Sequence, residues 1–120
     1  MRNTLIASLA LAAFVAAAGQ AAAHASVKST TPTDKASVAS PEELDLTFSE
    51  ALNLPFSKLH LLGPDGKEIE IGKGVLKDAD KTLTAPVTGP LKPGTYTVRW
   101  NVLSVDGHKT NGTYTFTVKP

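Results

Sequence analysis

Residues 95–103 read Thr95-Tyr96-Thr97-Val98-Arg99-Trp100-Asn101-Val102-Leu103. Large apolar side chains occupy every second position of this stretch, at Tyr96, Val98, Trp100 and Val102, and most of the residues between them are polar. Successive side chains of a β-strand point to opposite faces of its sheet, so this alternation predicts a long strand with one buried face. We expect Trp100 to fill the core and assign it no functional role.

Similar patterns recur on both sides of this stretch. Shorter strands are predicted over residues 25–30, 44–48, 57–62, 68–71, 81–87 and 113–118. Turn sequences such as Pro64-Asp65-Gly66 and Asn111-Gly112 separate them, residues 31–41 and 72–80 are expected to be connections, and no helix is predicted after residue 23. About seven short strands separated by turns are typical of an all-β fold, here an antiparallel β-sandwich of immunoglobulin-like type.

The first 23 residues have the features of a cleaved secretory signal peptide. Arg2 supplies a positive charge, residues 5–18 are apolar apart from Ser8, and Ala21-Ala22-Ala23 is a small-residue cleavage sequence. An uncleaved membrane anchor is the alternative, but a 14-residue apolar run is shorter than the roughly 20 residues that span a bilayer. We therefore expect export with cleavage after Ala23, which leaves one domain of 97 residues, 24–120.

Composition excludes several classes of function for this domain. Without Arg2, 11 lysine and arginine residues balance 11 aspartate and glutamate residues. They form no basic cluster, so neither nucleic acid nor an anionic membrane surface is expected as a partner. The chain has no cysteine, which excludes disulfides, a cysteine nucleophile and a blue-copper centre with histidine and cysteine ligands.

The stretch Ser104-Val105-Asp106-Gly107-His108 follows the long strand and carries a carboxylate and an imidazole two positions apart. In extended backbone, Asp106 and His108 face the same side. Cleavage after Ala23 would make His24 the first residue, and a terminal histidine chelates a divalent ion through its α-amine and Nδ1. These three residues then offer three nitrogens and one carboxylate oxygen, which suits tetragonal Cu(II), although zinc could also be held by this set.

A structural or surface role is the alternative for each histidine outside the leader. Asp-Gly is also an ordinary hairpin sequence, so Asp106-Gly107-His108 alone is a weak sign of metal binding. His60 alternates with Leu59 and Leu61, so its side chain is predicted to point away from theirs. We expect His60 to be structural or on the surface rather than a metal ligand.

The mature chain resembles the CopC-type periplasmic copper-resistance proteins. The resemblance is carried by His24 after the signal peptide and by residues 46–50, 93–100, 104–108 and 112–118. It implies a cupredoxin- or immunoglobulin-like sandwich that binds one Cu(II) ion through His24, Asp106 and His108. It also implies that Glu50 lies near the copper as an outer-sphere group, for which an exposed glutamate at a strand end is the alternative.

The function implied by this resemblance is periplasmic copper binding for resistance, buffering or transfer. The expected partners are the copper ion and an inner-membrane CopD-type transporter or another periplasmic copper protein, and the chain is expected to be a monomer and not an enzyme. Many members of the family carry a methionine-rich loop that holds Cu(I). Here Met1 is the only methionine and leaves with the leader, so we expect one Cu(II) site and no Cu(I) site.

Two other functions stay open from the sequence. A terminal-histidine copper chelate with a second histidine also resembles the active site of lytic polysaccharide monooxygenases, which are oxidative enzymes. The anionic oxygen of Asp106 argues against that function because it should favour Cu(II) and discourage reduction. A metal-free adhesion or scaffold domain is the other alternative, since this fold class supports many functions.

Overall fold

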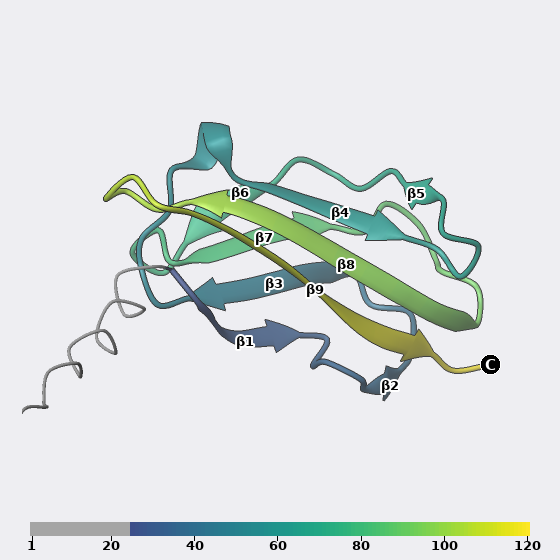
Figure 1. The fold of residues 1–120 in the computed structure, drawn as a ribbon. Helices are drawn as coiled ribbons and strands as arrows, with labels where there is room; N and C mark the ends of the chain where they lie inside the picture. Colours follow the sequence, from purple (N-terminus) through teal and green to yellow (C-terminus); the bar gives the residue numbers. More distant parts are fainter. Residues whose placement is uncertain (1–24) are drawn as a thin grey trace, which may run out of the picture.

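The computed structural model describes residues 25–120, which form two β-sheets packed face to face (Figure 1). His24 and the expected signal peptide lie outside the described residues. One sheet has the strand order β1-β3-β7-β6 and the other has the order β2-β9-β8-β4-β5. The elements are β1 (Val27–Thr31), β2 (Ser37–Val38), β3 (Glu43–Phe48), the 3-10 helix η2 (Leu54–Phe56), β4 (Lys58–Leu62), β5 (Glu68–Ile69), β6 (Val75–Lys77), β7 (Thr82–Pro86), β8 (Gly94–Leu103) and β9 (Lys109–Val118).

The long strand predicted from the alternating stretch is β8, and its apolar face is buried. Tyr96, Val98 and Val102 are at most 3% exposed and Trp100 is 9% exposed. The apolar face of β3 belongs to the same buried cluster, and the ring of Phe48 packs edge-on against Trp100 with centroids 5.2 Å apart. The predicted all-β sandwich and the core role of Trp100 are therefore confirmed.

The strand count differs from the expected seven because two short strands lie in segments that were predicted to be connections. Within residues 25–120 nine strands form. The additional ones are β2, which pairs in parallel with the end of β9, and β6, which pairs with β7. Neither has a strong alternating pattern, so their strand conformation follows from backbone pairing with a neighbour and not from their own sequence.

The prediction of a turn at Asn111-Gly112 is wrong, because both residues lie inside β9. The chain turns earlier, at residues 104–108, where the Ser104 N–H donates to the His108 carbonyl at 3.0 Å and Gly107 adopts a φ of 95°. Gly112 is opposite Trp100 in the β8–β9 pair. A Cβ at this position would lie 2.6 Å from Cζ2 of Trp100, so packing under the indole, and not a turn, accounts for this glycine.

Three segments that are distant in sequence meet at one end of the sandwich. The β8–β9 loop, the start of β1 and helix η2 all lie there, and the C-terminus lies at the opposite end (Figure 1). The segment 49–53, which follows β3, links them, since Val105 N–H donates to the Ala51 carbonyl at 2.9 Å and Asn53 N–H donates to the Leu103 carbonyl at 2.8 Å. This end carries the candidate site.

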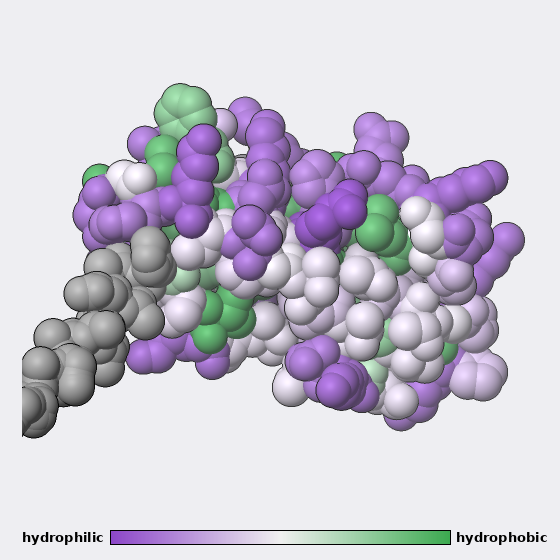
Figure 2. Space-filling model, viewed as in Figure 1, coloured by the Kyte–Doolittle hydropathy of each residue, from purple (hydrophilic) through white to green (hydrophobic). Residues whose placement is uncertain are grey.

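The face of the sandwich seen in Figure 2 is mostly hydrophilic or intermediate in hydropathy, and hydrophobic atoms appear there only as separate small areas. This agrees with the burial of the apolar rows between the two sheets. Among the residues that the structure describes, no helix has the length and apolar character needed to cross a membrane.

Candidate metal centre

Asp106 and His108 lie together in the loop that joins β8 to β9. His108 Nδ1 is 3.2 Å from Asp106 Oδ1, and the two side chains are 41% and 44% exposed. The pair was predicted from its spacing of two residues, and the structure brings the two groups together. The two groups therefore face each other in the loop, and His108 Nδ1 itself is buried.

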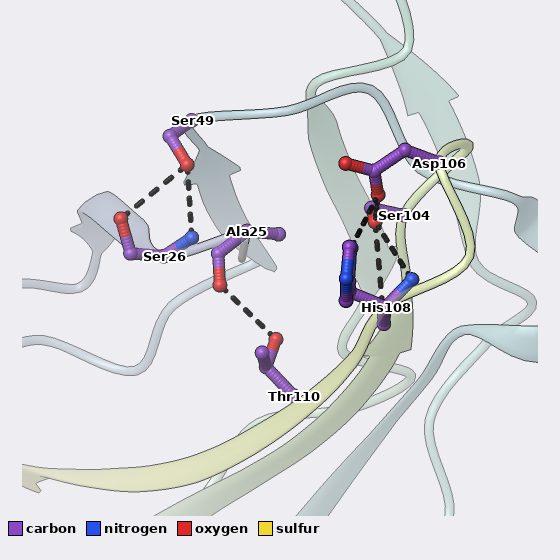
Figure 3. Close-up of polar contacts among 7 residues, drawn as sticks. All are labelled: Ala25, Ser26, Ser49, Ser104, Asp106, His108 and Thr110. Atoms are coloured by element: carbon purple, nitrogen blue, oxygen red, sulfur yellow. Dashed lines mark hydrogen bonds and ion pairs between the residues drawn. The ribbon is translucent and has the colours of Figure 1, made fainter. Parts of the chain in front are cut away.

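Ser104 is buried beneath the β8–β9 loop and stabilises its conformation through hydrogen bonds. The residue is 1% exposed, and its hydroxyl donates to Asp106 Oδ1. Ser104 Oγ also accepts a hydrogen bond from the His108 backbone N–H at 3.3 Å. Figure 3 shows Ser104 between the two side chains. One buried hydroxyl thus contacts both residues of the pair, a role that the sequence reasoning did not assign.

The pKa of the Asp106 carboxyl is lowered from its ordinary value. The hydrogen bond from the Ser104 hydroxyl is the largest cause, followed by the hydrogen bond from His108. Both interactions favour the ionised carboxylate, which accepts hydrogen bonds but cannot donate them. Asp106 is therefore held in the form that can bind a cation.

The start of the described chain is fastened to the same loop region. Thr110 lies in β9 two residues after His108, and its Oγ1 donates to the Ala25 carbonyl at 3.1 Å. Ser26 N–H donates to Ser49 Oγ at 2.9 Å. Figure 3 shows Ala25 on the side of Ser26 that faces the Asp106–His108 pair. The residue that directly follows His24 thus lies beside β9, the strand that begins one residue after His108.

Glu50 occupies the linking segment between two of these contacts. Its neighbour Ser49 donates its N–H to the Ser26 carbonyl at 2.8 Å, and its other neighbour Ala51 accepts from Val105 N–H. The backbone of Glu50 is therefore at the site end of the sandwich. Its expected place near the copper, as an outer-sphere group, stays a prediction.

His60 lies on β4 and makes a separate pair with Glu68 of β5. Its Nδ1 is 2.8 Å from Glu68 Oε2, and the side chains are 32% and 56% exposed. Leu61, the next residue, is fully buried, so His60 faces outward, as its alternation with the neighbouring leucines predicted. This partnered position in the outer face of the sheet agrees with the structural or surface role expected for His60.

Asp106 and His108 carry the kinds of donor that bind divalent metal ions, a carboxylate oxygen and an imidazole nitrogen. Their 3.2 Å contact joins His108 Nδ1 to Asp106 Oδ1, so a metal ion would be held through the other ring nitrogen of His108. Within residues 25–120 no group of three or more histidine, cysteine, aspartate or glutamate side chains gathers that could hold a metal ion.

Sequence reasoning missed three hydroxyl residues: Ser104, which contacts the pair, and Ser49 and Thr110, which contact the two residues after His24. Ser49 and Ser26 are 23 residues apart, and Thr110 and Ala25 are 85 residues apart, so no local spacing could have indicated their contacts. Ser104 is adjacent to the predicted motif, and a serine two residues before an aspartate is a known source of local hydrogen bonds. This local spacing could have identified Ser104 as a hydrogen-bond partner of Asp106.

Comparison with known proteins gives consistent matches over nearly the whole described chain. Residues 27–119 match the family model for the CopC domain. Protein YobA of Escherichia coli K12 is 44% identical over 99 residues, which cover 81% of this chain and 80% of that protein. Copper resistance protein C of Escherichia coli is 40% identical over 106 residues, which cover 82% of this chain and 84% of that protein.

Solved structures agree with the sequence matches. The crystal structure of PcoC, a methionine rich copper resistance protein from Escherichia coli, aligns with a TM-score of 0.72 at 36% identity. The alignment covers 80% of this chain and 99% of PcoC. The range matched by the family model includes Asp106 and His108 and begins three residues after His24.

Proposed function

Because this chain belongs to the CopC family, we propose that it is a periplasmic copper-binding protein. It holds one Cu(II) ion for copper resistance, buffering or transfer. The ligands are His24, which becomes the first residue when the leader is cleaved after Ala23, together with Asp106 and His108. The protein carries the metal and does not use it in catalysis.

The observation that carries this proposal is the hydrogen bond between Thr110 Oγ1 and the Ala25 carbonyl. Across a trans peptide bond, neighbouring Cα atoms are only about 3.8 Å apart. A chain that begins at His24 therefore begins within one residue of a contact on β9, two residues after His108. This supports the idea that the new amino terminus and the Asp106–His108 pair serve one metal ion.

The proposed ligands come from two segments of the chain, the new amino terminus and the β8–β9 loop. His24 supplies its α-amine and Nδ1 in one chelate, and Asp106 and His108 supply an oxygen and a nitrogen. This set of nitrogen and oxygen donors suits Cu(II), whereas Cu(I) prefers sulfur ligands. The chain has no cysteine, and Met1 is its only methionine, in contrast to the relative described as methionine rich. We therefore propose no Cu(I) site.

A half-exposed pair of ligands suits a protein that passes its metal on. The Asp106 and His108 side chains are 44% and 41% exposed, so a competing ligand can approach them without unfolding of the domain. The proposed acceptor is a CopD-type inner-membrane transporter or another periplasmic copper protein. We propose that the protein acts as a monomer.

The decisive test compares two amino termini. One protein begins at His24, and the other keeps Ala23, so that the α-amine of His24 is tied up in a peptide bond. The processed protein is expected to bind one equivalent of Cu(II) with a tetragonal electron paramagnetic resonance spectrum rich in nitrogen couplings. The extended protein should bind far more weakly. Equal affinity and identical spectra would contradict the proposed ligand set.

A matched pair of histidine variants tests the other half of the site. His108→Ala removes a proposed ligand, whereas His60→Ala removes a histidine that is also partly exposed and paired with a carboxylate. Loss of an outer-shell partner alone reduces metal affinity about 10- to 100-fold, so His108→Ala should reduce it by more. His60→Ala should leave affinity and stoichiometry unchanged. If both variants behave alike, His108 is not a specific ligand.

A further inference from the structure

We propose that Thr110 and Ser49 are positioning residues that hold the amino terminus of the processed chain beside Asp106 and His108. This inference rests on the proposed function and deepens it. Neither residue supplies a donor atom to copper. Both act on the two residues that follow His24.

Thr110 holds the peptide group between Ala25 and Ser26. Its Oγ1 donates to the carbonyl of Ala25 at 3.1 Å, and Ala25 itself is 2% exposed and belongs to the core cluster. Thr110 lies within β9 and is paired with Val102 of β8. The hydroxyl therefore comes from a rigid element, and that same element begins one residue after His108.

Ser49 fixes the next residue from the opposite side. Its Oγ accepts the Ser26 N–H at 2.9 Å, and its own N–H donates to the Ser26 carbonyl at 2.8 Å. The Ser26 hydroxyl also reaches Ser49 Oγ at 3.3 Å. Ser49, which directly follows β3, thus holds Ser26 by its amide, its carbonyl and its side chain.

These contacts matter because a chain end is otherwise free to move. Ordering a terminus at the moment of metal binding opposes binding, and holding it in place beforehand removes part of that penalty. Two hydroxyl groups on two different strand ends fasten the residues behind His24 in the metal-free protein. We therefore expect each hydroxyl to raise copper affinity about two- to tenfold, the range of a net hydrogen bond.

The first experiment uses the processed protein that begins at His24. Thr110→Val removes the hydroxyl and keeps the shape of the side chain, whereas Thr110→Ser keeps the hydroxyl. Copper affinity measured by competition with a chromophoric chelator should fall about two- to tenfold in Thr110→Val and stay near wild type in Thr110→Ser. An equal loss in both variants, or in neither, would overturn the assignment to the hydroxyl.

A double-mutant cycle then separates this inference from the proposed function. Thr110→Val is repeated in a chain that keeps Ala23 and carries His24→Ala, which lacks both donors of the terminal chelate. In that background the variant should have no further effect on copper affinity. If the background change itself leaves affinity unchanged, the proposed function fails. If the background weakens binding but Thr110→Val acts equally in both chains, Thr110 acts on the fold as a whole and the positioning role is wrong.

The role of Ser49 is tested by hydrogen exchange in the metal-free protein and by the copper spectrum. The Ser26 amide should be protected from hydrogen exchange in the metal-free protein because it donates to Ser49 Oγ. Nuclear magnetic resonance should show faster exchange of this amide in Ser49→Ala, with unchanged exchange at Val98 in the centre of β8. Ser49→Ala should also broaden the distribution of copper sites seen by electron paramagnetic resonance. Unchanged exchange at Ser26 would overturn the role of Ser49.

Discussion

At the scale of single residues, Ser104 shows how one buried hydroxyl can shape a surface site. It donates to Asp106 Oδ1 and accepts from the His108 amide, so both proposed ligands depend on it. Ser57 offers a comparison within the same region. It is also buried, and its hydroxyl donates to the Asn53 carbonyl at 2.8 Å and accepts from the Leu103 N–H.

Ser104→Ala and Ser57→Ala should therefore destabilise the fold similarly but affect copper differently. Each removes hydrogen bonds made by a buried hydroxyl, which costs about 0.5–1.5 kcal/mol of unfolding free energy for each bond. Only Ser104→Ala frees Asp106 and His108 to move, so only this variant should lower copper affinity. Denaturant unfolding and copper titration of both variants provide the check. Equal affinity in the two would show that Ser104 supports only the fold.

The carboxyl group of Asp106 should make the unfolding free energy of the metal-free protein depend on pH. Its pKa is lowered in the folded state, first by Ser104 and then by His108. A carboxyl group with a lowered folded-state pKa stabilises the fold above its ordinary value near 3.9, and this contribution is lost as the pH falls through the folded-state pKa. Asp106→Asn should therefore flatten the acid side of the stability curve. Urea unfolding without copper between about pH 2 and pH 5 measures this, and curves of equal slope for the wild type and the variant would refute it.

The two proposed ligands within the described chain could be predicted because they are close in sequence. Asp106 and His108 are two positions apart, and the structure brings them to 3.2 Å. The hydroxyls that organise the site could not be predicted in this way. Thr110 meets Ala25 only because the fold places β9 beside the chain start, and no local pattern encodes that meeting.

At the scale of elements, alternation predicted the strands with a buried face and failed where pairing alone makes the strand. β3 and β8 could be predicted because the apolar residues that alternate along them form the core. β2 has only two residues and is defined by its pairing with β9, so it carries almost no signal of its own. β9 was predicted too short, since Asn-Gly is a common hairpin turn sequence and Gly112 instead makes room for Trp100.

This interpretation of Gly112 can be tested against another glycine. A methyl group at Gly112 would meet the Trp100 ring at 2.6 Å, whereas a Cβ at Gly89 would have no atom within 4 Å. Gly112→Ala should therefore destabilise the fold by about 1–3 kcal/mol through overpacking. Gly89→Ala should be neutral or slightly stabilising because it restricts the unfolded chain. Equal stability of the two variants in denaturant unfolding would show that close packing against Trp100 does not account for this glycine.

At the scale of the whole molecule, the sandwich gathers three distant segments at one end. The linking segment 49–53 contacts the chain start through Ser26 and the β8–β9 loop through Val105. The strand order explains why, since β1 pairs with β3 in one sheet and β8 pairs with β9 in the other. The sequence indicated two halves of a site, but only the topology shows that the start of β1 and the β8–β9 loop share an end (Figure 1).

Copper should consequently join the two sheets and stabilise the whole domain. A ligand that binds only the folded state stabilises it by about 2.7 kcal/mol when its free concentration is a hundredfold above the dissociation constant. For a domain of this size, about 1 kcal/mol shifts the melting temperature by roughly 4–8 °C. The protein that begins at His24 should therefore melt about 10–20 °C higher with Cu(II) under these conditions.

The size of this shift should depend on processing. The protein that keeps Ala23 lacks the free amine and should show a much smaller rise at the same copper concentration. Differential scanning calorimetry of both proteins, with and without Cu(II), makes the comparison. No shift in either protein would favour the metal-free scaffold, and an equal shift in both would mean that copper binds without the amine. A large shift in the processed protein alone would show that tight copper binding needs the free amine of His24.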